Sequence, residues 1–183
     1  MTEISLDSVK RYRGTPPAGT KLFEGPGLNW IWMGMNTQHP KLQDIRIRQA
    51  IQNTVDVEAI IESAYAGVAE RSRGIVCPGL IGHRTTTAYE KPDLAKAKAL
   101  MAESGVKDLS LDLKILNQGA FLTAAQVVKA NLEEIGITVN IVPLDSGPFW
   151  NLGLESAGTD WKDLQMYIQR FGDAPDPSQM AQW

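Results

Sequence analysis

The chain has 183 residues, of which 18 are basic and 21 acidic, and its formal net charge is −3. Hydrophobic residues at 43% and charged residues at 21% lie near the averages for globular proteins, so extensive disorder is not expected. The slightly acidic balance gives no general electrostatic reason to bind nucleic acid or an anionic membrane. No apolar stretch reaches the ~20 residues of a membrane span.

The two ends of the chain have few features of their own. Residues 2–7 lack the basic and apolar regions of a secretory signal peptide. Residues 171–183 form a proline-rich stretch that stops on a tryptophan, with no pattern of a closing helix or strand. We therefore expect the sequence to be an excised piece of a larger protein.

The N-terminal part of the chain predicts one helix and two extended segments. Apolar residues near helical spacing predict a short amphipathic helix over 2–12, and the prolines and glycines of 14–19 end it. Residues 21–24 and 28–36 then read as extended.

The second extended segment is apolar on both faces. Trp30 and Trp32 share one face because side chains alternate along a strand. The other face carries Ile31, Met33 and Met35. Two apolar faces predict a covered strand rather than an edge strand.

Two helices are predicted next. Asp44 is typical of an N-cap, and an apolar stripe at helical spacing continues from it to Val55. Asp56 is a second N-cap candidate, for a helix over 57–66 that Gly67 ends.

A long loop follows, over 68–89, and its length indicates a surface or site-lining role. Residues 92–105 predict a helix, with Pro92 in its first turn and Gly105 at its end.

The remaining patterns predict a βαβ unit. A strand over 109–115 alternates apolar and polar residues, and a helix over 121–135 follows it. A second strand over 137–141 ends before Pro143. Two strands joined by a crossover helix are normally parallel, so the fold class is α/β. The last predicted elements are a short helix over 149–156 and a strand over 164–169.

Few side chains have the setting of a catalytic group, and the sequence has no Gly-x-Ser-x-Gly elbow and no Walker loop. The single cysteine, Cys77, excludes an intramolecular disulfide and any cysteine-built zinc site, and its apolar neighbours predict a small buried hydrophobe. His39 is expected to be a turn residue and His83 a solvated loop residue; a ligand contact is the less favoured interpretation for both. We expect no metal and no cofactor.

The cations and tryptophans have two interpretations each. Arg46 and Arg48 are expected to be solvated or to serve the structure, and the Arg-Ser-Arg stretch at 71–73 is expected to be solvated. Core packing is the favoured role of Trp30 and Trp32. The alternative is a stacking surface for the apolar or sugar face of a ligand.

Four stretches of the sequence then follow one another in a recognisable order. They are Met-Asn-Thr-Gln-His-Pro at 35–40 with Asp-Ile-Arg-Ile-Arg-Gln-Ala-Ile at 44–51, the helix at 89–105, the helix and strand at 125–142, and Asp-Ala-Pro-Asp-Pro at 173–177. Together they resemble the motifs of bacterial extracytoplasmic solute-binding proteins of family 5, the peptide, nickel and oligosaccharide receptors of ABC importers. The resemblance covers nearly the whole chain.

The resemblance implies two lobes that close on a solute about a hinge. Residues 1–183 would form a single domain, the core of the second, C-terminal lobe, without the first lobe. Its implied fold is a periplasmic-binding-protein-like lobe with a mixed sheet flanked by helices. An intact relative would be exported to the periplasm or the cell surface and would deliver its solute to ABC permease subunits.

The resemblance also implies residue roles. In peptide-binding relatives the first aspartate of the Asp-x-Pro-Asp-Pro loop pairs with the ligand's α-ammonium group, and here it is Asp173. Some dipeptide receptors hold the ligand carboxylate with an arginine whose approximate equivalent here is Leu122, so a peptide, opine-like or sugar-like solute is expected rather than a dipeptide. The predicted ligand contacts are Asp173, Phe121, Trp30, Trp32, Trp150 and Phe171.

Two other interpretations remain open. The same fold could serve as a ligand-sensing regulatory domain. A small hydrolase or transferase could use His83 or Asp173 as a general base. The sequence shows no nucleophile and no second acid at the spacing of a known catalytic motif.

Overall fold

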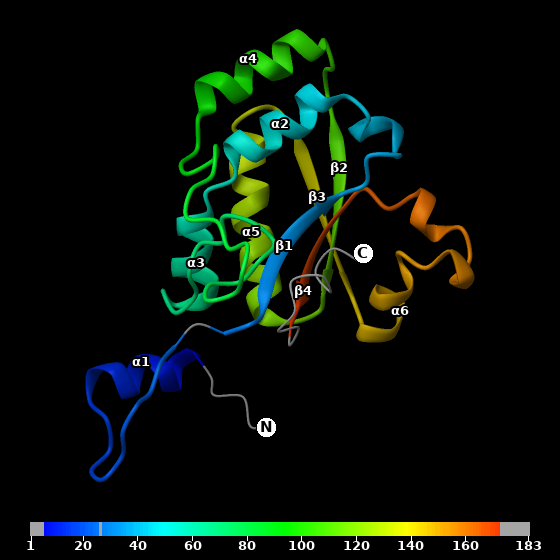
Figure 1. Cartoon of the computed structure of the whole chain (residues 1–183). Coiled ribbons are helices and arrows are strands. Elements are labelled where there is room, and N and C mark those ends of the chain that lie inside the picture. The colour runs from blue at the N-terminus through cyan, green and yellow to red at the C-terminus, as the bar shows by residue number, and fades with distance from the viewer. Residues whose placement is uncertain (1–5, 26, 173–183) are drawn as a thin grey trace.

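The computed structural model describes residues 6–25 and 27–172 (Figure 1). The helices and strands are, in chain order, α1 (Leu6–Gly14), β1 (Trp30–Met35), α2 (Ile45–Thr54), α3 (Val57–Tyr65), α4 (Leu94–Ser104), β2 (Ser110–Leu116), α5 (Gly119–Glu133), β3 (Thr138–Leu144), α6 (Ser146–Asn151) and β4 (Met166–Phe171). Short 3₁₀ helices lie at η1 (Pro40–Leu42), η2 (Glu155–Ala157) and η3 (Asp160–Lys162). The fold is mixed α/β, as the sequence predicts.

The strands of the described residues form one mixed sheet in the order β1-β4-β2-β3. β1 runs antiparallel to β4, whereas β2 runs parallel to both β4 and β3. α5 connects β2 to β3 and packs against both strands. The predicted parallel βαβ unit is therefore confirmed.

The core lies between this sheet and its helices. Leu111, Leu113 and Ile115 of β2 are fully buried, while Asp112 and Lys114 between them are half-buried. This alternation matches the predicted strand pattern. α3 packs on α5 and α2 packs on α4. In Figure 1 these helices lie toward the top and left, with α6 at the lower right.

The prediction of a covered strand rather than an edge strand is wrong about the edge, because β1 is an edge strand of the described sheet. Its apolar faces have other partners. Met33 and Met35 pack against the main core, and Trp30 packs against Cys77 from the loop after α3. The loop therefore covers the second apolar face of β1, while one edge of β1 has no strand partner among the described residues.

Three helices begin at aspartate N-caps whose side chains accept a hydrogen bond from the first turn. Asp44 accepts a hydrogen bond from the Arg46 backbone N–H at 2.8 Å, and Asp56 accepts one from Ala59 at 3.1 Å, which confirms both predicted caps. Asp93, which the sequence analysis missed, caps α4 through the backbone N–H of Lys96 at 2.9 Å. Pro92 thus lies before the cap and not in the first helical turn.

Helix ends that the sequence assigned to glycines are confirmed. Gly105 ends α4 with φ at +70°, a left-handed conformation that glycine adopts without steric cost. α3 ends in a similar way, with Ala66 at φ +54° followed by Gly67 at φ +67°.

Several boundaries differ from prediction. Residues 21–24 form no strand. β3 continues through Pro143, which an edge strand tolerates because the missing N–H can face away from the ladder. α6 begins at Ser146 and accommodates Pro148 in its first turn, where a backbone N–H has no helical partner in any case. The strand predicted at 164–169 lies two residues later.

The loop between α3 and α4 has no helix or strand over residues 68–89, as predicted. No helix of the described residues has the length and apolar character needed to cross a membrane.

Candidate ligand-binding site

A cavity of about 1020 Å³ lies along β1. Its walls come from β1, α3, α5, the loop over 68–89 and the segment that joins α1 to β1. The long loop is therefore site-lining, as its length indicated. Strand, helix and loop residues far apart in the sequence meet here.

Trp30 and Trp32 line this cavity. Their rings are stacked, with centroids 4.2 Å apart and planes inclined by 21°. The stack follows from the two-residue spacing along β1, which places both side chains on one face. Both rings are half-buried, so they offer a flat apolar surface of the kind that binds a ligand's apolar or sugar face.

Phe171 lies beside this surface. It stands opposite Trp30 in the β1–β4 register and shares a small apolar cluster with Cys77, Leu28 and Leu80. Burial raises the pKa of the Cys77 thiol. A buried thiol held in its neutral form confirms the prediction of a small hydrophobe rather than a reactive group.

Phe171, Phe121 and Trp150 do not line this cavity. Phe121 is 3% exposed and belongs to the main core, where it presents no surface to a ligand. Trp150 is 45% exposed on α6, where its ring meets Phe149 edge-on at 5.7 Å. Asp173 lies outside the described residues. Leu122, the residue that the resemblance suggests as the approximate equivalent of the dipeptide-receptor arginine, is 40% exposed.

Arg71 is the cavity residue that sequence reasoning misjudged. The sequence predicts a solvated side chain, but the side chain is only 8% exposed. Its Nη2 donates a hydrogen bond to the Tyr89 carbonyl, across the loop. The residues next to Arg71 in the sequence do not indicate this burial. The groups that contact its guanidinium, the Tyr89 carbonyl and the Glu58 carboxylate of α3, lie elsewhere in the chain.

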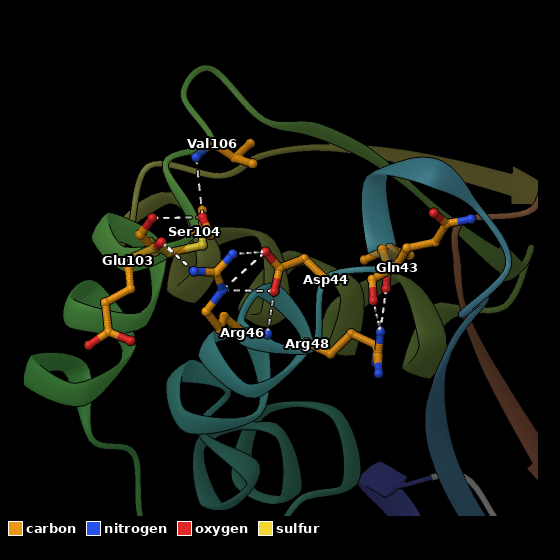
Figure 2. Close-up of polar contacts among 9 residues, drawn as sticks. Gln43, Asp44, Arg46, Arg48, Glu103, Ser104 and Val106 are labelled. Atoms are coloured by element: carbon orange, nitrogen blue, oxygen red, sulfur yellow. Dashed lines mark hydrogen bonds and ion pairs between the residues drawn. The ribbon is translucent and has the colours of Figure 1, made fainter.

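Arg46 and Arg48 have structural roles, as expected (Figure 2). Arg46 forms a two-pronged pair with Asp44, at 3.0 Å from Nε and 2.6 Å from Nη2, and its Nη1 donates to the Glu103 carbonyl at 2.5 Å. Arg48 donates to the carbonyls of Leu42 and Gln43. Arg46 thereby ties the start of α2 to the last turn of α4.

The histidines contact the backbone. His39 Nδ1 accepts a hydrogen bond from the Lys41 N–H at 3.2 Å, which confirms its role in a turn. His83 is half-buried rather than solvated, with Nδ1 2.9 Å from the Val76 carbonyl oxygen. Within residues 6–25 and 27–172, no group of three or more His, Cys, Asp or Glu side chains has the arrangement of a metal site.

The arrangement is suited to binding. A flat aromatic surface, a buried guanidinium and the Tyr65 hydroxyl line one partly apolar cavity, which is the usual composition of a small-molecule site.

Comparisons with known proteins agree with this interpretation. The whole chain, residues 1–183, matches the family described as bacterial extracellular solute-binding proteins, family 5 Middle. It is 30% identical over 135 residues to the dipeptide-binding protein of Escherichia coli K12, covering 70% of this chain and 25% of that protein. It is 27% identical over 164 residues to the probable di/tripeptide-binding protein 5 of Pseudomonas aeruginosa UCBPP-PA14, covering 87% of this chain and 30% of that one.

A solved structure shares the fold. The putative peptide-binding protein AppA from Clostridium difficile superposes with a TM-score of 0.83 at 23% identity, over 97% of this chain and 36% of that one. The chain thus spans 25% to 30% of the length of these two curated relatives. Because the family match extends over every residue, the chain belongs to the family 5 bacterial extracellular solute-binding proteins and has the periplasmic-binding-protein fold.

Proposed function

We propose that this chain is part of the solute-binding component of an ABC importer. The family match over the whole chain carries the proposal. In it, residues 1–183 form one domain, the core of the second, C-terminal lobe, and a further lobe of the parent protein closes over the solute. The parent acts outside the cytoplasmic membrane, in the periplasm or at the cell surface, and delivers its solute to permease subunits.

The proposed capture is non-covalent. Burying a small solute between two lobes removes its apolar surface from water, and a few polar groups fix its orientation. Trp30 and Trp32 supply an aromatic surface for this purpose on the described lobe. The relatives are solute-binding proteins and not enzymes, and the proposal includes no chemical reaction.

The proposed solute is peptide-like, opine-like or sugar-like. The names of the curated relatives favour a peptide. Leu122 provides no cation where dipeptide receptors place an arginine, so a plain dipeptide is less favoured. Asp173 remains the proposed partner of a solute ammonium group, because a carboxylate that faces a cation forms a charge-assisted hydrogen bond.

Calorimetry on two proteins tests this proposal. The complete parent and the 183-residue chain are each titrated with short peptides, opines and sugar conjugates. We expect the parent to bind at least one of them and the isolated chain to bind it at least about a hundredfold more weakly, since half of the enclosing surface is missing. Equal affinities would show that no second lobe is needed, and a parent that binds none of them would contradict the solute-binding role.

A further inference from the structure

Arg71 has hydrogen-bond donors that the protein does not use. Its Nε and Nη1 atoms are buried and have no hydrogen-bond partner. Two carboxylates approach them: Glu58 lies 3.5 Å from Nη1 and Glu90 lies 3.8 Å from Nε. Charge-assisted hydrogen bonds are shorter, at about 2.7–2.9 Å, so these contacts are ion pairs without a hydrogen bond.

Neither carboxylate forms a short hydrogen bond with Arg71. Glu90 accepts its short hydrogen bonds from Arg73, at 2.8 Å, and from the Thr87 backbone N–H, at 3.1 Å. The hydrogen bond from Arg73 is also the main reason that the pKa of Glu90 is lowered. The Glu58 side chain is 67% exposed, so it can turn toward solvent. An incoming anion can therefore take the place of Glu58 beside Arg71.

A third unused donor lines the same cavity. The Tyr65 hydroxyl is buried without a hydrogen-bond partner. Burial raises the pKa of Tyr65, and the positive charge of Arg170 offsets this effect only in part. The hydroxyl thus stays neutral and able to donate. Within the described part of the chain, the only buried side-chain nitrogen or oxygen atoms lacking a partner are this hydroxyl and the two Arg71 atoms.

Unsatisfied buried donors are costly, and all three belong to residues that line the same cavity, which indicates an acceptor that arrives from outside. We propose that Arg71 and the Tyr65 hydroxyl bind a carboxylate group of the solute, while the solute's apolar part lies against Trp30 and Trp32. This deepens the proposed function and rests on it. The cation that the chain lacks at Leu122 is then supplied by the loop after α3, at a different place in the lobe.

Phenylacetate and its uncharged analogue phenylacetamide test the site on the 183-residue chain. Binding is followed by tryptophan fluorescence and by the NMR signal of the Arg71 Nε–H group. We expect phenylacetate, but not phenylacetamide, to shift the Arg71 signal and to bind at least about tenfold more tightly than the amide. Equal binding of the two compounds, or an unmoved Arg71 signal, would overturn the proposal.

Variants separate a ligand role from a structural one. Arg71→Gln should abolish the preference for phenylacetate over the amide, and Tyr65→Phe should reduce it. The control Arg84→Gln, on an exposed arginine of the same loop outside the cavity lining, should leave it unchanged. If Arg71→Gln prevents folding, Tyr65→Phe still decides the matter, because an unchanged preference in that variant would remove the hydroxyl from the site.

The parent protein distinguishes this proposal from the one on which it rests. If the parent captures its solute equally well with and without Arg71→Gln, the carboxylate site is wrong and the solute-binding role stands. If the wild-type parent captures no solute at all, the solute-binding role itself fails.

Discussion

At the residue scale, the contact between Gly34 and Tyr167 shows why one position of β1 must lack a side chain. The two residues stand opposite each other in the β1–β4 register. A Cβ atom on Gly34 would lie 2.5 Å from Tyr167 Cε1 and 2.6 Å from the hydroxyl oxygen. The tyrosine ring therefore occupies the space above the glycine, an arrangement that compensates for a missing side chain within a strand.

Gly34→Ala should destabilise the protein by about 1–3 kcal/mol, because the half-buried tyrosine ring must move away from its packing position. The free energy of unfolding in urea measures the effect. Gly119→Ala is the matched control, since nothing lies within 4 Å of a Cβ at that position. A Gly34→Ala protein as stable as the control would show that the ring moves freely.

Asp44 gives the second prediction at this scale. The Arg46 side chain is the largest cause that lowers the pKa of Asp44, followed by the hydrogen bond from the Arg46 backbone N–H. A folded-state pKa below the unfolded value of about 3.9 gives stability that is present above that value. The stability is lost as the pH falls through the lower, folded-state pKa.

Asp44→Asn keeps an N-cap acceptor but cannot ionise. The variant should be less stable than the wild type at neutral pH, and the difference should shrink as the solution becomes more acidic than about pH 4. Urea unfolding over a series of pH values measures this. A difference that stays constant with pH would mean that the charge of Asp44 contributes nothing.

At the element scale, local signals predicted the helices and the parallel βαβ unit well, but the edge position of β1 wrongly. Asp44 and Asp56 were recognisable as caps because a cap and its partner lie within three residues of each other. The edge position of β1 could not be recognised, because it depends on pairing with β4 at the far end of the described chain. Two apolar faces on a strand indicate that both faces are covered, but they do not indicate whether both edges pair with other strands.

Asn36 joins two of these elements. Its Nδ2 donates to the carbonyls of Trp161 and Leu164, at 3.0 and 2.9 Å, and its Oδ1 accepts from the Gln38 backbone N–H at 3.0 Å. One side chain thus fixes the end of β1 against the segment that leads into β4.

Asn36→Asp should cost about 1–3 kcal/mol, since it removes both donors and places a carboxylate against two carbonyl oxygens. Chemical denaturation measures the loss. Asn151→Asp makes the same chemical change at an exposed position of α6 and should stay within about 0.5 kcal/mol of the wild type. Equal losses in the two variants would contradict the role of Asn36 as a link.

At the scale of the whole molecule, the candidate site combines predictable and unpredictable parts. The shared face of Trp30 and Trp32 follows from strand alternation alone, and the structure places both rings on the cavity. Arg71 and Tyr65 could not be recognised from the sequence, because their burial depends on long-range packing around the loop and α3. Phe121 was predicted to contact the ligand but lies in the core, because an aromatic residue at the start of a helix is equally suited to core packing.

Under the proposed function, the aromatic-lined cavity of this chain should bind a second copy of the chain when no other lobe covers it. Phe23 lines this cavity and is 88% exposed, so it is available for contact between copies. Sedimentation velocity of the 183-residue chain should show weak, reversible association that grows with protein concentration. Phe23→Ser should weaken it, whereas Trp150→Ser, on the exposed part of α6 outside the cavity lining, should not. A monomer at every concentration, or association that depends on Trp150 instead, would mean that the cavity face does not behave as an uncovered surface.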